Sequence, residues 1–147
     1  MPIYTIVSGD VTGAATKTIL SLIAATTRRG RITGILIGSS ATPADNAAKF
    51  LLRRFTADGT GTGVTPLAVD PAESTAILTA KTNYSAEPTY STGSLLEIAL
   101  NQRATFQWFP TEEKEKLVVP ATSGNGIGLQ MVSGPTVAYN VTFVYEE

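Results

Sequence analysis

The chain has 147 residues, a length that suits a single domain with its own hydrophobic core. It contains no cysteine and no histidine, which excludes disulfides, thiolate chemistry and every catalytic triad built on these residues. Charged residues make up only 16% of the chain and the net charge is −1. A surface so poor in charge tends to associate, which predicts an oligomer or a partner-bound state.

The stretch "GDVTGAATKT" at residues 9–18 has the composition of a phosphate-binding loop but not its spacing. Such a loop places its second glycine five residues after the first, with lysine immediately behind it. Here Gly9 and Gly13 are four apart, and Lys17 follows four residues later. The stretch therefore predicts a turn between an N-terminal strand and the next apolar segment, not a nucleotide site.

The next three apolar segments predict strands. The segment 16–29, "TKTILSLIAATTRR", fits a helical stripe as well as a strand, and its many β-branched residues favour the strand. "RITGILIGS" at 31–39 is apolar on both faces and predicts a central strand. "AAKFLLRRFTA" at 47–57 predicts another strand.

The middle of the chain is the least regular part. "DGTGTG" at 58–63 departs from the dinucleotide-binding spacing, and the prolines that follow argue against the helix which that motif needs. It predicts a tight hairpin tip. The segment 64–94 predicts long surface loops around one strand, "TAILTAK" at 75–81.

Four segments near the C-terminus alternate with a period of two, as half-buried strands do. They lie at 94–101, 101–109, 125–133 and 137–147. "PTEEKEK" at 110–116 predicts an exposed, charged hairpin between two of them. Turn signals separate the strands every eight to twelve residues, which is typical of an all-β sandwich or barrel. No linker or repeat divides the chain, so residues 1–147 form one predicted domain.

No set of residues predicts catalysis, a cofactor or a metal. Glu112, Glu113 and Glu115 are close in sequence, as glycosidase carboxylates must be in space, but they alternate with lysines on a predicted solvated tip. Asp45 and Asn46 lack the spacing of a calcium loop. We therefore expect a protein that is not an enzyme.

Arg28, Arg29 and Arg31, together with Arg53 and Arg54, form the only basic clusters. A nucleic-acid reader needs a larger basic excess with exposed aromatic residues, so no nucleic-acid partner is expected. No apolar run is long enough to span a membrane. The arginines at 28, 29 and 31 are predicted to pair with carboxylates of a neighbouring subunit or a partner surface.

The aromatic residues of the last strands are predicted to dominate the core or a subunit interface, because each buries a large apolar area. Phe106 and Phe143 are assigned to the core. Trp108 and Tyr139 are placed near a threefold contact, where a polar tip meets a neighbouring subunit.

Three stretches in order give the chain a resemblance to a known family. They are "ATKTILSLIAATTRRGRITGILIG", "LLRRFTADGTGTGVTPLAVDPA" and "LVVPATSGNGIGLQM" leading to the terminal "VYEE". Together they resemble the small jelly-roll virion proteins of tailed bacteriophages that decorate or cement the capsid. The strand of Phe106 and Trp108, with the V-V-P strand after it, also resembles the C-terminal half of TNF-like jelly rolls, which are usually trimers.

The resemblance implies one TNF-like jelly roll of about eight strands. It further implies a homotrimer that binds the major capsid protein on the head surface, resists internal DNA pressure, and joins the virion in the host cytoplasm. The alternative is a carbohydrate- or receptor-binding jelly roll of a phage tail, neck or fibre. That alternative needs an exposed aromatic platform, for which Tyr84 and Tyr90 are the candidates.

Overall fold

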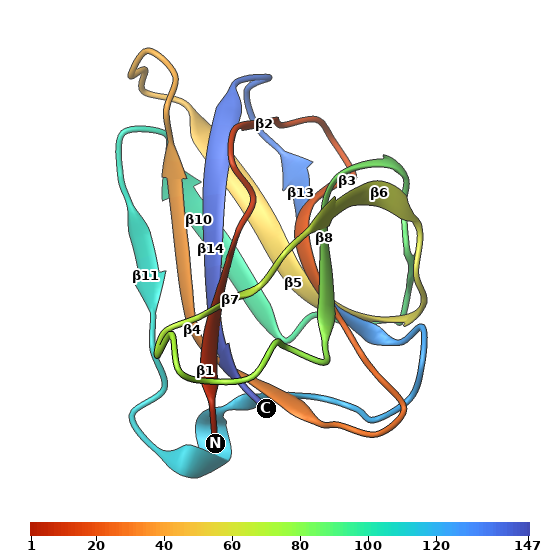
Figure 1. Cartoon of the computed structure of the whole chain (residues 1–147). Coiled ribbons are helices and arrows are strands. Elements are labelled where there is room, and N and C mark those ends of the chain that lie inside the picture. The colour runs from red at the N-terminus through yellow and green to blue at the C-terminus, as the bar shows by residue number, and fades with distance from the viewer.

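The computed structural model describes all residues from 1 to 147 and consists of strands with one short 3₁₀ helix, Glu113–Glu115. The strands form two antiparallel sheets that lie face to face (Figure 1). The predicted all-β sandwich is therefore confirmed. The N- and C-terminal ends lie near each other at one end of the sandwich (Figure 1), the end that we call the terminal end.

The first sheet, sheet A, has the order β11-β4-β14-β1-β7, with β12 beside β4 and β2 beside β14. The long strands β4 and β14 form its centre and pair over most of their length. The bounds of its strands are β1 Ile3–Val7, β2 Val11–Thr12, β4 Gly30–Ser39, β7 Leu67–Ala68, β11 Phe106–Trp108, β12 Leu117–Val119 and β14 Ala138–Glu146.

The second sheet, sheet B, has the order β10-β5-β13-β3-β8-β6, with β9 beside β5. Its centre is β13, which pairs with β5 on one side and β3 on the other. The bounds of its strands are β3 Lys17–Ile23, β5 Ala47–Ala57, β6 Thr60–Val64, β8 Thr79–Ala86, β9 Thr89–Tyr90, β10 Leu96–Asn101 and β13 Gly126–Ser133.

Eleven of these strands make up eight longer ones, because three of the eight are interrupted. Each interrupted strand consists of two short strands that pair with the same long neighbour. These are β1 and β2 along β14, β9 and β10 along β5, and β11 and β12 along β4. In chain order the eight pass from one sheet to the other, except that the fourth and fifth are neighbours in sheet B, and this arrangement is that of a jelly roll. The insertion between the fourth and fifth strands supplies β6, β7 and β8.

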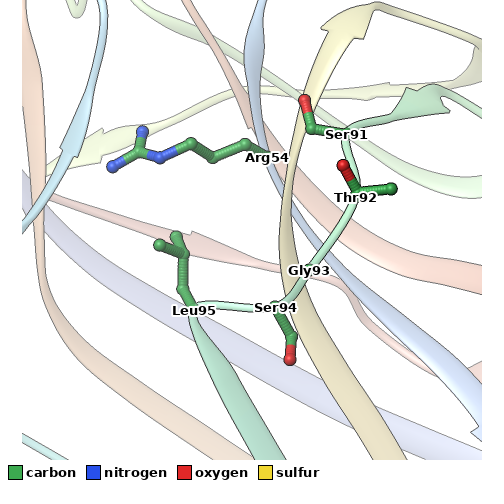
Figure 2. Close-up of a pocket in the computed structure, with 6 residues that line it drawn as sticks. All are labelled: Arg54, Ser91, Thr92, Gly93, Ser94 and Leu95. Carbon is green, nitrogen blue, oxygen red and sulfur yellow. The ribbon is translucent and has the colours of Figure 1, made fainter.

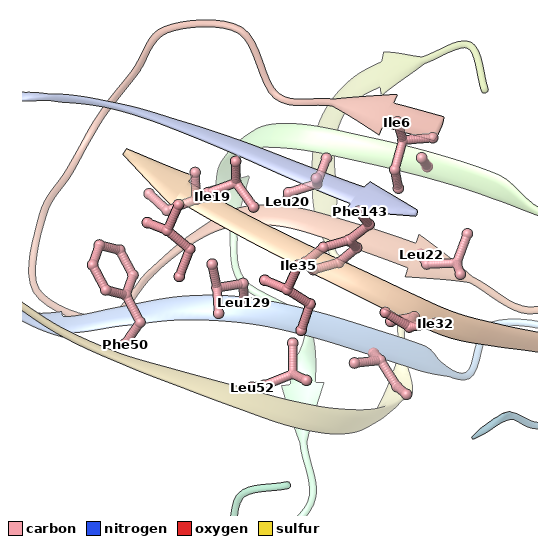
Figure 3. Packing of buried hydrophobic residues seen from close by; sticks show 14 of the residues in the cluster. Ile6, Ile19, Leu20, Leu22, Ile32, Ile35, Phe50, Leu52, Leu129 and Phe143 are labelled. Carbon is pink, nitrogen blue, oxygen red and sulfur yellow. The ribbon is translucent and has the colours of Figure 1, made fainter. Parts of the chain in front are cut away.

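The core lies between the sheets and is apolar because period-two alternation directs one face of every strand inward. Figure 3 shows side chains of both sheets meeting there, among them Ile35 and Phe143 from sheet A and Phe50 and Leu129 from sheet B. Phe143 is fully buried, as expected, and Phe106 is partly buried against the same cluster. β3 is a strand and not a helix, and a bulge opposite Leu129 and Gln130 turns both Ile19 and Leu20 inward.

Three local predictions were wrong because non-local pairing overrode local turn signals. The segment 110–116 is not a hairpin: β11 and β12 run in the same direction along β4, and the chain bulges out between them. β6 follows "DG" but pairs with β8, not β5, and the backbone of Ala86 and Glu87 fills the space beside Gly59. The strand expected at 75–81 begins at Thr79.

Candidate functional site

The two sheets differ in what lies on their outer faces. On sheet B, the side chains of Tyr84 and Tyr90 and the segment between β8 and β9 cover part of the outer face. Tyr84 bonds the Ser21 hydroxyl at 2.5 Å, and Tyr90 bonds the Thr18 hydroxyl at 2.7 Å. Thr18 and Ser21 are therefore fully buried, although they point away from the core. No such segment covers the middle of sheet A.

The open face of sheet A carries a group of apolar side chains, which we call the sheet A patch. Register places residues of β1, β14 and β4 side by side on it, since Val7 lies opposite Thr142 and Thr142 lies opposite Leu36. Val7 is 54% exposed and Leu67 is 64% exposed. The members of the patch are Ile3, Val7, Leu36, Leu67, Val69, Phe109 and Val144.

Phe109 extends the patch over the centre of the sheet. It follows β11, and its ring lies on Gly34 of β4, where the ring occupies the space that a side chain at position 34 would need. The ring is still 52% exposed. A glycine is thus required at this point so that an aromatic ring can lie against the sheet and remain open to contact from outside.

A charged cluster borders the patch at the terminal end of the sandwich. Arg31 Nη1 lies 2.6 Å from Glu113 Oε1 and 3.6 Å from Glu146 Oε1. Lys116 Nζ lies 2.5 Å from Glu113 and 3.0 Å from Glu146. The Lys116 ammonium lowers the pKa of Glu113, and the Glu113 carboxylate in turn raises the pKa of Lys116.

A second polar group borders the patch at the opposite end. Asp10 accepts hydrogen bonds from the Ser40 hydroxyl at 2.7 Å and the Asn140 amide at 2.5 Å. The hydrogen bond from Ser40, and to a smaller extent the one from Asn140, lower the pKa of Asp10. Thr5, Thr33 and Thr142 lie among the apolar residues of this face. A largely uncharged centre between polar borders is the usual organisation of a protein–protein interface.

The arginines predicted to pair with a partner behave differently from one another. Arg31 bonds to carboxylates of its own chain, and its role in pairing with a neighbouring subunit stays a prediction. Arg28 and Arg29 lie in the exposed loop between β3 and β4 and form no ion pair. They remain available to a partner at the terminal end of the sandwich.

The two aromatic residues predicted near a subunit contact face the core. Tyr139 is fully buried, and its ring meets Phe50 edge to face at 5.2 Å. This corrects its interface assignment, because its position on β14 has the same phase as the buried residues Val141 and Phe143. Trp108 pairs with Ile35 and is partly buried against the core cluster, so only part of the ring is open.

Tyr84 and Tyr90 do not form the exposed aromatic platform that carbohydrate binding needs. Tyr84 is 4% exposed, and its hydroxyl donates to Asp58. Tyr90 lies beneath the Arg53 guanidinium, 4.8 Å from it, and against the edge of Phe55. Through their hydroxyl groups, both tyrosines hold the segment between β8 and β9 against the outer face of β3.

No group of three acidic, histidine or cysteine residues lies close enough to hold a metal ion. No helix has the length and hydrophobicity needed to cross a membrane. Compared with known proteins, the chain matches no protein-family model, no curated protein and no solved structure.

Sequence reasoning missed the sheet A patch, although a signal for it was present. In "IYTIV" the residues Tyr4 and Ile6 alternate with Ile3 and Val7, so both faces of the strand are apolar. Only one of these faces meets the core, because β1 lies in sheet A, and sheet B packs on one side of sheet A only. Phe109 was not singled out, since it lies one residue beyond the strand.

Proposed function

We propose that this chain is a bacteriophage capsid decoration protein that forms a homotrimer and binds the major capsid lattice. The observation that carries the proposal is the sheet A patch, which holds five of the seven large hydrophobic residues that the chain exposes. Monomeric proteins rarely leave such a face open. The resemblance to jelly-roll virion proteins supplies the phage head as the place of assembly.

In this proposal the patch holds the subunits together, and other surfaces of the trimer meet the capsid. The patch supplies the buried apolar area that a stable oligomer needs. Arg28 and Arg29, which are exposed and unpaired, add charge for contact with an acidic surface. Many weak contacts repeated over the lattice give tight binding through avidity, so no deep pocket or catalytic group is required.

The first test measures the mass of the purified protein by light scattering, together with one charged variant. The wild-type chain is expected at three times its mass of 15.4 kDa. Val7→Glu places an unpaired carboxylate in the patch, where burial costs several kcal/mol, so this variant is expected as a folded monomer. Ala99→Glu, at an exposed position on the outer face of sheet B, is the matched control and keeps the wild-type mass.

The second test counts copies of the protein in purified virions by quantitative mass spectrometry. Decoration of the lattice predicts hundreds of copies per particle, and particles assembled with Val7→Glu should carry far fewer. A handful of copies would place the protein in the tail, neck or fibre and would overturn the assignment to the capsid. A wild-type monomer that still coats capsids would overturn only the role of the patch in trimer formation and would leave the assignment to the capsid standing.

A further inference from the structure

A cavity of about 130 Å³ opens beside β5, between the sheets' edges and the segment 91–95. Figure 2 shows the Arg54 side chain extending away from Ser91 and Thr92, with the Leu95 side chain below its guanidinium group in this view. The other residues that line the cavity are Ser91, Thr92, Gly93 and Ser94. A guanidinium group beside a loop that offers backbone amides has a composition suited to an oxyanion.

Arg54 is the only charged residue of the cavity, and it has no carboxylate partner. It lies opposite Ile127 in the register, in phase with the inward residues Leu52 and Phe50, at the point where the core ends. Its Nη1 donates to the carbonyl oxygen of Val118 in sheet A, which holds the side chain in place. The Nε and Nη2 groups donate to no acceptor in the protein and are free for a ligand.

The segment 91–94 presents further free donors. The amides of Ser91 and Leu95 bond back to β5, to the carbonyl groups of Arg54 and Leu52, and so fix both ends of the segment. Between them Gly93 has a φ of +86°, and the amides at 92, 93 and 94 have no acceptor within the chain. Backbone with a residue of positive φ among free amides forms concave sites for anions.

The surrounding charges favour a ligand with a single negative charge. Arg53 lies next in sequence, but its guanidinium group is already committed to Gln130, the carbonyl of Ser91 and the ring of Tyr90. The Ser94 hydroxyl donates to Glu97, a carboxylate paired with Lys49 at 3.1 Å. The single positive charge of Arg54 balances one negative charge on a ligand, and the Glu97 carboxylate near the rim disfavours a second negative charge.

We infer that this cavity binds a carboxylate group, with the free Nε and Nη2 of Arg54 as a two-point donor. The planar fork of the guanidinium matches the two oxygens of a carboxylate, and the residues whose amides are free line the same cavity. This inference does not depend on the proposed function. The carboxylate comes either from a small organic acid or from an acidic side chain of a partner protein.

The test follows the backbone amide signals of the ¹⁵N-labelled protein during titration with sodium acetate, with sodium chloride at equal ionic strength as the control. Acetate is expected to shift the signals of residues 92–94 with saturation in the millimolar range, and chloride is not. N-acetylglutamine amide and N-acetylglutamate amide distinguish the sources. Tighter binding of the glutamate compound than of acetate indicates a partner's side chain, and equal binding indicates a small acid.

Arg54→Gln is expected to weaken acetate binding tenfold or more, and Arg54→Lys to weaken it less. Because Arg54→Gln also removes the bond to Val118, Gly93→Ala provides a second variant that leaves the arginine in place. It disfavours the positive φ that shapes the amide segment, with an expected loss of a few-fold. Arg28→Gln, an exposed arginine in another loop, is the matched control and should bind as the wild type does. Equal shifts with chloride, or unchanged binding in Arg54→Gln, would overturn the inference.

Discussion

Tyr145 offers the sharpest test of the core, because its hydroxyl group is buried without a hydrogen-bond partner. The side chain is fully buried on β14, and its ring stacks on Tyr4 at 5.4 Å with an interplanar angle of 25°. Tyr145→Phe removes the unsatisfied hydroxyl and keeps the stacked ring. We therefore expect a substitution in the core that stabilises the protein, which is uncommon.

The magnitude follows from the cost of burying an unpaired polar group. That cost is about 1–3 kcal/mol, and the void left by the missing oxygen offsets part of the recovered free energy. We expect a net gain of about 1 kcal/mol in the free energy of unfolding. For a chain of this length, this corresponds to a rise in Tm of roughly 2–4 °C.

Tyr4→Phe is the matched control, since the two rings lie together but their hydroxyl groups differ. The Tyr4 hydroxyl donates to the carbonyl oxygen of Ser74 at 3.0 Å. Its removal should cost about 0.5–1.5 kcal/mol. Both variants are unfolded in urea at one protein concentration, because association changes apparent stability. If Tyr145→Phe lowers stability as much as Tyr4→Phe does, the hydroxyl of Tyr145 has a partner and the reasoning is wrong.

Three further predictions follow from the same packing. Burial raises the pKa of Tyr84 and Tyr145, so on raising the pH the unfolded chain loses these protons before the folded chain does. The free energy of unfolding should therefore stay constant below about pH 10 and fall above it, which urea midpoints measured between pH 8 and 11 would show. Gly126→Ala should cost several kcal/mol by circular dichroism melting, because the Phe55 ring occupies the space of the new methyl group; a neutral result would contradict this. Trp108→Ala should cost roughly 2 kcal/mol, since its ring is only partly buried, and an unchanged melt would remove it from the core.

The alternation of apolar residues was enough to predict the sandwich and most of its long strands. In β14 the inward residues Tyr139, Val141, Phe143 and Tyr145 are those that the period of two places on one face. The pattern succeeds there because β14 lies in the centre of sheet A, with a single face against the core. The same pattern argues against the interface role of Tyr139, since a residue in phase with the core points toward the core.

Features that depend on distant partners could not be predicted from the sequence. The excursion between β11 and β12 has the local composition of a hairpin, and only the shared partner β4 shows that the strand continues. The burial of Thr18 depends on the segment around Tyr90, about seventy residues later in the chain. The free donors of Arg54 likewise depend on which carboxylates the fold leaves out of reach.

The interrupted strands at the edges of the sheets have a consequence for solubility. Sheet A ends in β7, of two residues, and in β11 and β12, of three residues each. An added strand needs a longer continuous row of free amide and carbonyl groups to pair with. Proteins with few charges usually have little electrostatic protection against ordered aggregation. The short strands at both edges of sheet A therefore leave little continuous backbone to which a strand of another copy could add.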